Sequence, residues 1–302
     1  MAWYPHAKNV AAKLAAKTEY EITHQFTFAT SSLPPILPNN SGRRVWGPLA
    51  IPDGAVVPWG KQRATLREST FVRIAAEIGR RTLKYSDTVI CQNDTTFEYA
   101  KKLGLDAVLE PNVVAEPVAC NRSELNNLIY VGNLIDRKRP WLAIQALNEQ
   151  SMGRYTLDIV GDGPLFSALK SYVRLERLDN RVRFHGRLTH SETIQHISDA
   201  RTLLLPSSRE GAGWVVGEAA ACGVPSVVFS DTGAATVQRL SGHMGSIVRN
   251  DPSPLPGDFA RGIRQADTVD TSATDRWSSV RLAPFLDSTW FGRGVSEEKM
   301  LP

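Results

Sequence analysis

The residues best suited to chemistry lie in one short segment, where two acids flank a glycine-rich turn. Glu210 is followed by Gly-Ala-Gly-Trp-Val-Val-Gly, and Glu218 closes the segment. An apolar run at 202–206 precedes it and another at 226–229 follows it, so the pattern predicts a strand, a loop, a helix and a strand. Ligands of open α/β sheets bind at the carboxyl ends of strands. Amides that open a helix favour anions, and a carboxylate accepts hydrogen bonds from sugar hydroxyls. The segment therefore suits a ligand that is part phosphate and part sugar.

This segment resembles the retaining glycosyltransferases of family 4, which have the GT-B fold. Glu210 and Glu218 match the two acids of that family. Gly211 and Gly213 match its glycines, and Ala212 stands where Phe is usual. Two Glu at this spacing are weakly specific, but the glycines, the preceding Leu-Pro-Ser and the following Ala-Cys-Gly-Val-Pro make the match strong. The resemblance implies that Glu210 contacts the transferred sugar, that Glu218 binds the donor ribose, and that the amides of 211–213 face the donor.

A second candidate segment follows the apolar run at 128–131. Gly132, Asn133, Arg137 and Lys138 lie in a stretch that is similar to the family's Gly-Arg-Leu…Lys motif. Lys138 matches the family Lys, which neutralises the donor diphosphate. Asn133 stands where an Arg is expected, and the loss of that planar phosphate donor is not conservative. Arg137 is the candidate to replace it, and the alternative for the whole stretch is a solvated basic turn.

Two further positions are weaker candidates. Gly161 and Gly163 follow the next predicted strand, where glycine permits close approach of backbone to a ligand, although many α/β proteins have such a turn for structural reasons alone. His24, in His-Gln-Phe-Thr, and the later Trp-Gly-Pro at 46–48 resemble segments of a bacterial subgroup of family 4. That resemblance implies a catalytic His24 facing the cleft, and the alternative is a structural hydrogen bonder.

The catalytic prediction is Glu210, Lys138 and His24, with no metal and no cofactor. The sequence has no Ser-His-Asp arrangement, no zinc-ligand spacing and no Asp-x-Asp pair. The resemblance implies metal-independent transfer from a UDP- or GDP-linked sugar, with the acceptor hydroxyl attacking on the face from which the nucleotide departs.

The elements that position these residues alternate regularly in the second half of the chain. Strands are expected at 128–132, 155–161, 182–186, 202–206 and 226–229, with helices between them. Thr189 and Glu192 form a capping-box pattern at the start of one helix. This alternation predicts a parallel, doubly wound α/β sheet.

Domain organisation follows from a composition break rich in Pro and Asn at 111–123, which predicts a linker. We expect a GT-B-like fold of two Rossmann-like domains. Residues 1–110 form a partial N-terminal acceptor-side domain, 124–270 a nucleotide-sugar-binding domain, and 271–302 a C-terminal helix packing back toward the N-terminal domain. The first 110 residues show few strands and no opening glycine-rich turn, so we expect an incomplete domain and nucleotide binding that is better than turnover.

Composition bounds the class of protein. The 302 residues are 42% hydrophobic with a net charge of +4, which favours packed domains and is too mild to indicate nucleic acid. Three scattered cysteines, the lack of a long apolar run and an N-terminus unlike a signal peptide predict a cytoplasmic protein. From Lys61 to Lys84, seven basic residues stand against two acids, 7 − 2 = +5. Apolar residues interleave with them at helical spacing, which predicts either a solvated helix face or a peripheral contact with anionic lipid at the inner membrane face.

The function predicted is sugar transfer from a nucleotide-sugar donor to a glycan or lipid-linked acceptor with retention, in polysaccharide or glycolipid biosynthesis. The alternative is a catalytically impaired, shortened paralogue that binds nucleotide or glycan. A GT-B sugar-nucleotide epimerase is a further rival, but the acids of that family are spaced differently.

Overall fold

The computed structural model describes residues 3–26, 34–38, 42–51, 65–118, 126–251, 254–269 and 271–291. Residues 119–123 of the predicted linker, 61–64 of the basic segment and 292–302 of the predicted C-terminal helix lie outside these ranges, as does Cys120. The chain divides into two compact units. One comprises 1–53, 70–112 and 280–302, and the other comprises 54–69 and 113–279.

The first unit is built on a four-stranded parallel sheet in the order β1-β2-β3-β4. Its strands are β1 (Ile22–Gln25), β2 (Arg43–Leu49), β3 (Thr88–Cys91) and β4 (Asp106–Leu109). Its helices are α1 (Trp3–Ala15), most of α2 (Leu66–Thr82), α3 (Asp94–Lys102) and α10 (Leu282–Phe291). One core cluster joins Trp46 and Val89 to α2 and α3, and another joins Val45 and Ile90 to Phe285 of α10.

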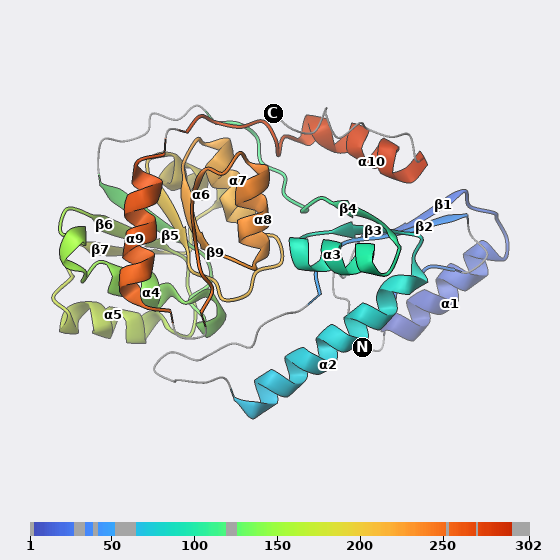
Figure 1. Cartoon of the computed structure of the whole chain (residues 1–302), viewed down its shortest axis with the longest axis horizontal. Coiled ribbons are helices and arrows are strands. Elements are labelled where there is room, and N and C mark those ends of the chain that lie inside the picture. The colour runs from blue at the N-terminus through green and yellow to red at the C-terminus, as the bar shows by residue number, and fades with distance from the viewer. Residues whose placement is uncertain are drawn as a thin grey trace. The chain divides into compact units, whose positions relative to one another are not determined.

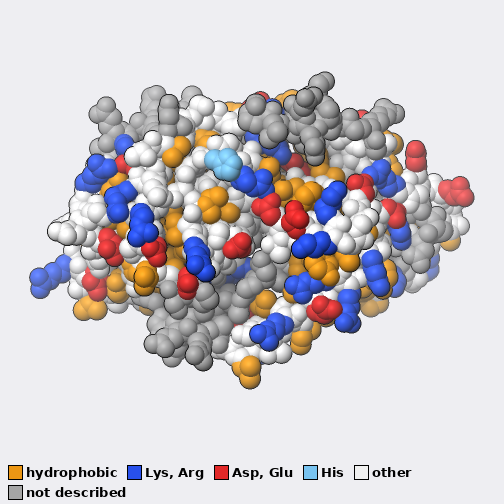
Figure 2. All heavy atoms as spheres, viewed as in Figure 1, with side chains coloured by type: hydrophobic (Ala, Val, Ile, Leu, Met, Phe, Trp, Pro, Cys, Tyr) orange, Lys and Arg blue, Asp and Glu red, His pale blue; other side chains and the backbone are white. Residues whose placement is uncertain are grey.

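The α2 helix places its large apolar side chains outward. Its buried face consists mainly of small residues, including Ala75, Ala76 and Gly79. Phe71 is 61% exposed and Ile74 is 56% exposed. Basic residues lie on the same helix, and Figure 2 shows orange and blue side chains together over the part of the surface where Figure 1 draws α2. The amphipathic pattern read from the sequence is therefore an exposed stripe and not the face that packs on the core.

The second unit is built on a six-stranded parallel sheet in the order β10-β9-β8-β5-β6-β7. Its strands are β5 (Asn127–Val131), β6 (Thr156–Val160), β7 (Val182–Gly186), β8 (Thr202–Leu205), β9 (Ser226–Phe229) and β10 (Gly245–Val248). Its helices are α4 (Pro140–Ala146), α5 (Phe166–Leu175), α6 (His190–Ser198), α7 (Trp214–Ala221), α8 (Gly233–Leu240) and α9 (Pro256–Asp267). The prediction of a parallel α/β sheet is confirmed.

Two cores cover the two faces of this sheet. One contains residues of α4, α5 and α9, such as Trp141, Leu169 and Phe259, and the other contains residues of α6, α7 and α8, such as Ile197, Val216 and Val237. The chain runs from β5 outward to β7 and then returns to β8 on the opposite side of β5. The strand order thus reverses between β5 and β8, the place where open α/β sheets bind ligands.

Candidate functional site

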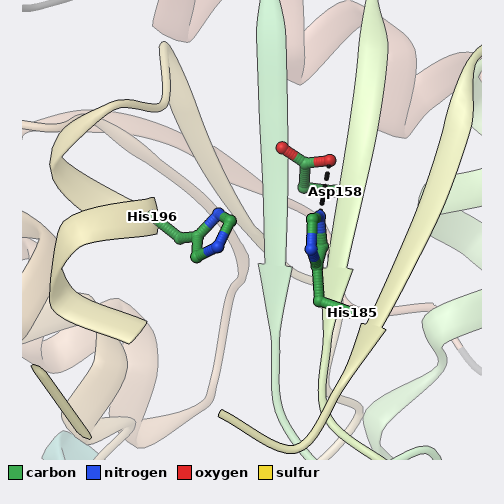
Figure 3. Close-up of side chains that lie close together, drawn as sticks. All are labelled: Asp158, His185 and His196. Atoms are coloured by element: carbon green, nitrogen blue, oxygen red, sulfur yellow. Dashed lines mark hydrogen bonds and ion pairs between the residues drawn. The ribbon is translucent and has the colours of Figure 1, made fainter. Parts of the chain in front are cut away.

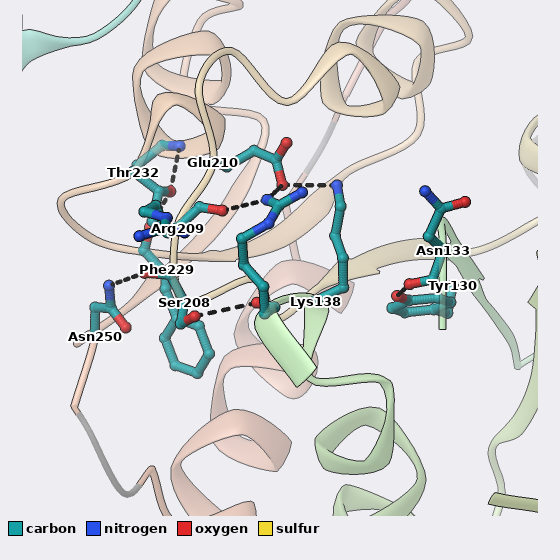
Figure 4. Close-up of polar contacts among 11 residues, drawn as sticks. Tyr130, Asn133, Lys138, Ser208, Arg209, Glu210, Phe229, Thr232 and Asn250 are labelled. Atoms are coloured by element: carbon teal, nitrogen blue, oxygen red, sulfur yellow. Dashed lines mark hydrogen bonds and ion pairs between the residues drawn. The ribbon is translucent and has the colours of Figure 1, made fainter. Parts of the chain in front are cut away.

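The loops that follow β5 and β8 meet at this reversal and bring together two of the predicted residues. Nζ of Lys138 lies 2.6 Å from Oε2 of Glu210, and both side chains are largely buried, at 14% and 13% exposure. Arg137 donates to the carbonyl of Arg209 at 2.6 Å, and the same nitrogen lies 3.4 Å from the Glu210 carboxylate (Figure 4). The β5 and β8 strands are hydrogen-bonded neighbours, so their carboxyl ends place these loops side by side.

The two loops are also joined through their backbones. The amide and the hydroxyl of Ser208 both donate to the carbonyl of Arg137, at 2.9 and 3.1 Å. Asn250 donates to the carbonyl of Ser208 and accepts from Arg139, linking a third loop to the pair. The basic and acidic side chains are consequently held by contacts that do not depend on their own ion pair.

Arg139 is a structural anchor that the sequence did not reveal. It is 3% exposed, adopts a left-handed conformation with φ of 47°, and immediately precedes α4, which begins at Pro140. Its guanidinium lies 5.4 Å from the ring centroid of Phe229, and burial lowers its pKa to about 10. The left-handed residue ends the 3-10 turn that carries Lys138, and α4 starts directly after it.

The turn around Asn133 uses its backbone. Buried Tyr130 donates its hydroxyl to the carbonyl of Asn133 at 3.1 Å, and burial raises the pKa of that hydroxyl. The side chain of Asn133 is exposed. Gly132 donates its amide to Val160, and a Cβ on Gly161 would lie 2.0 Å from the carbonyl of Gly132, so glycine is required at 161.

Two further glycines, the predicted Gly163 and also Gly233, allow close contacts between loops. A Cβ on Gly163 would lie 2.6 Å from the carbonyl of Leu134. Gly233 donates its amide to the carbonyl of Glu210 at 2.8 Å, and a Cβ there would lie only 1.7 Å from the carbonyl of Gly211. Ala212 is buried at 4% exposure, which leaves little space for the Phe that is usual in the resembling family.

The start of α7 has the form of an anion site. Gly213 is its N-cap in a left-handed conformation, with φ of 72°, and has no side chain that could cap the helix. The first-turn amides of a helix and its dipole favour a negative group. This helix also carries Glu218, so one short element presents both features to the carboxyl edge of the sheet.

Glu218 makes a separate contact and does not join the Lys138–Glu210 pair. Oε1 of Glu218 lies 3.7 Å from Nδ1 of His190, the first residue of α6, and the Glu218 side chain is 15% exposed. Burial raises the pKa of the Glu218 carboxyl, and the nearby His190 opposes that shift. Sequence reasoning missed His190 because nothing local marks it, although the capping box of Thr189 and Glu192 that fixes the start of α6 is confirmed.

His24 belongs to the first unit, and both of its ring nitrogens have protein partners. Trp290 donates its indole N–H to Nδ1 at 2.9 Å, so Nδ1 is the acceptor and Nε2 carries the proton that it donates to the carbonyl of Gly47 at 3.0 Å. Burial lowers the pKa of His24 and favours this neutral form. The geometry favours the structural alternative for His24, and its catalytic role stays a prediction.

Comparison with known proteins places this site in a family. Residues 119–266 match the glycosyl transferases group 1. The matching segment is just under half of the chain. The match spans Lys138, Glu210 and Glu218, the residues that the sequence assigned to the donor.

Two curated relatives of the chain are named for sugar transfer. It is 33% identical over 195 residues to glycogen synthase of Mycobacterium tuberculosis, covering 60% of this chain and 45% of that protein. It is 30% identical over 149 residues to D-inositol 3-phosphate glycosyltransferase of Streptomyces bingchenggensis, covering 45% and 32%. The chain spans about half or less of the length of these curated relatives.

The fold is also that of solved glycosyltransferases. The chain superposes on the Anabaena protein HepE in complex with UDP with a TM-score of 0.59 and 16% identity, covering 94% of this chain and 82% of that one. The chain thus has the GT-B fold, with parallel α/β sheets. Among its described residues, no helix has the length and apolar character to span a bilayer.

Proposed function

We propose that this chain is a retaining glycosyltransferase that moves a sugar from a UDP- or GDP-linked donor to a glycan or lipid-linked acceptor. The observation that carries the proposal is the meeting of Lys138 and Glu210 at the strand-order reversal, inside the segment that matches the family. The two relatives are named as a glycosyltransferase and a glycogen synthase, which does not favour the alternative of a binding protein without activity.

Each residue has a distinct role in the proposed donor complex. Lys138 supplies positive charge to the diphosphate, with Arg137 beside it and the first-turn amides of α7 as further donors. Glu218 accepts hydrogen bonds from the ribose hydroxyls, and His190 keeps its carboxylate in place. Glu210 faces the transferred sugar. These groups stabilise the charge that develops on the leaving nucleotide without requiring a metal ion.

In the proposed donor complex, the contacts of the Lys138–Glu210 ion pair must change. Lys138 has three N–H donors, so one stays hydrogen-bonded to Glu210 while the other two donate to phosphate oxygens. The pair holds both side chains at the sheet edge before the donor arrives, which lowers the cost of ordering them on binding. A carboxylate without this partner would repel the diphosphate.

Two experiments test this function. Thermal unfolding of the chain with UDP, GDP and their sugars identifies the donor, because a ligand that binds only the folded chain raises Tm. Transfer from that donor to glycan or lipid-linked acceptors is then followed by mass spectrometry, and the anomeric configuration of the product by NMR. A raised Tm with a retained configuration is expected. No Tm shift with any donor and no product would overturn the proposal.

A peripheral contact with an anionic membrane is part of the proposal. The exposed Phe71 and Ile74 lie on a helix that also carries Arg67, Arg73 and Arg80. An amphipathic helix of this composition binds at the lipid headgroups through both apolar burial and charge. This contact would bring the chain to a lipid-linked acceptor at the cytoplasmic face.

A further inference from the structure

Three side chains with metal-ligating atoms converge in the second unit, apart from the residues assigned to the donor. Asp158 lies on β6, His185 on β7 and His196 on α6. One ligand atom from each lies within 4.8 Å of the other two. Figure 3 shows the imidazole of His196 directed from α6 toward His185 and Asp158.

The carboxylate of Asp158 is buried and its orientation is fixed. The residue is 5% exposed, and its Oδ1 lies 2.9 Å from Nε2 of His185. Its Oδ2 accepts from the side-chain amide of Asn127 at 2.8 Å, and the Asn127 carbonyl oxygen accepts from Thr156 at 3.0 Å. A carboxylate oriented by a second layer of hydrogen bonds is a typical feature of metal sites.

The two imidazoles lie close together without satisfying each other. Their ring centroids are 4.5 Å apart. No hydrogen bond joins the ring of His196 to any other residue in the part of the chain that the structure describes. Both residues are partly buried, so water reaches the cluster from one side. A cation placed between the rings would use a lone pair of each and the charge of Asp158.

We propose that Asp158, His185 and His196 bind a divalent transition metal ion of the Zn²⁺ type. Two imidazoles and one carboxylate are a ligand set that Zn²⁺ takes, with a fourth position left for water. Ligand atoms around tetrahedral Zn²⁺ are about 3.3 Å apart for bonds of about 2.0 Å. The three ligand atoms lie within 4.8 Å of one another, so they must move closer together to reach that arrangement. The ion replaces the His185–Asp158 hydrogen bond and gives His196 a partner.

The consequence of binding is a tie between α6 and the β6–β7 edge of the sheet. Because His185 and His196 come from different elements, an ion that binds both stabilises the folded unit. The α6 helix begins at His190, which contacts Glu218 of α7. Metal binding should therefore also stabilise the helix whose first residue contacts a proposed donor-binding residue. Metal binding itself does not depend on the proposed transferase activity.

The test uses the tag-free 302-residue chain after removal of metals with a chelator. Zn²⁺ is titrated by calorimetry, and Co²⁺ is titrated with its visible absorption as the readout of coordination. We expect one equivalent to bind, and His196→Ala to bind at least tenfold more weakly, since loss of even a second-layer partner costs about 10–100-fold. His6→Ala, an exposed histidine on α1, is the matched control and should bind as the unchanged chain does.

A second variant separates ligand loss from misfolding. His196→Gln keeps a polar side chain of similar reach, and circular dichroism with thermal unfolding shows whether both variants fold. Zn²⁺ should raise the Tm of the unchanged chain and of His6→Ala more than the Tm of either His196 variant. Equal binding by the His196 variants, an absence of binding to the unchanged chain, or a thiolate charge-transfer band with Co²⁺ would each overturn the proposal.

Discussion

The ammonium group of Lys138 lies 2.6 Å from the carboxylate of Glu210, although 72 residues separate them in the chain. The contact arises because the β5 and β8 strands are parallel neighbours whose following loops leave the sheet at the same edge. The ion pair is short and largely buried, and we propose that Lys138 binds the diphosphate and Glu210 the sugar.

Replacing Lys138 with Ala should weaken nucleoside diphosphate far more than nucleoside, because only the diphosphate carries the charge that Lys138 binds. The loss is expected at about 1.5–3 kcal/mol, or roughly ten- to 150-fold in Kd. Calorimetry with UDP or GDP and with the corresponding nucleoside measures both. Lys170→Ala, an exposed lysine on α5, is the control. Equal losses for the two ligands would remove Lys138 from the phosphate site.

Glu218→Gln should lower nucleotide affinity at least tenfold, because Gln keeps the size but loses the charged acceptor of the ribose hydroxyls. The variant should remain folded, since burial already disfavours the charged form of Glu218. Calorimetry with the nucleotide and thermal unfolding check the two halves of this expectation. An unchanged affinity would contradict the ribose assignment.

Glu218 should also make the free energy of unfolding depend on pH. The folded-state pKa of Glu218 is raised, so the folded chain binds more protons than the unfolded chain between the usual Glu pKa and the raised value. The contribution of Glu218 to the free energy of unfolding is complete below that window and falls as pH rises through it. Urea unfolding of the unchanged chain and of Glu218→Gln from pH 4 to 8 should therefore show the variant gaining relative stability as pH rises.

The positions of Lys138 and Glu210 at strand ends could be predicted from the sequence because they follow local rules. Lys138 and Glu210 each follow a strand of the parallel sheet, so the end at which they meet is set by topology alone. His190 and Arg139 follow no such rule. The contact of Arg139 with Asn250 joins residues 111 positions apart, and only the folded sheet brings them together.

The sequence also did not predict which face of α2 packs on the core of the first unit. The period of Phe71 and Ile74 indicates a helix but not which face is buried, and the small residues Ala75 and Ala76 are the ones that pack. The short β10 and the helices α8 and α9 were not located from the sequence, although both helices have a clear amphipathic pattern.

Gly233→Ala should destabilise the fold and disturb the donor loop. Its Cβ would lie 1.7 Å from the carbonyl of Gly211, so the backbone that carries Glu210 must move. Overpacking of this kind costs about 1–3 kcal/mol. Gly153→Ala is the matched control, since its Cβ would meet nothing closer than 4.0 Å. Urea unfolding measures the cost, and equal stability of the two variants would show that the loop yields freely.

Exposed apolar residues of α2 should support binding to anionic vesicles. Phe71→Ser removes an exposed ring, and a joint Arg80→Glu, Arg81→Glu change reverses charge on the same helix. Both should reduce sedimentation with vesicles of phosphatidylglycerol and phosphatidylcholine, and the charge effect should weaken with salt. Leu175→Ser, on α5 and 77% exposed, is the control. Equal sedimentation of all variants would show that the exposed apolar and basic residues of α2 do not bind the membrane.

Trp290→Phe tests whether His24 holds the fold or performs chemistry. The change removes the indole N–H that donates to Nδ1 of His24 but keeps an aromatic ring on α10. Leaving a buried acceptor unsatisfied should cost about 1–3 kcal/mol in the free energy of unfolding.

The folded-state pKa of His24 is lowered, so its contribution to stability is present above the usual His pKa and is lost as pH falls through the lowered value. In the unchanged chain, the free energy of unfolding should therefore decline on acidification, and His24→Gln should reduce that decline. A structural His24 predicts that turnover per folded molecule stays within a few-fold in both variants. Turnover that drops a hundredfold or more in His24→Gln, with stability kept, would restore the catalytic assignment.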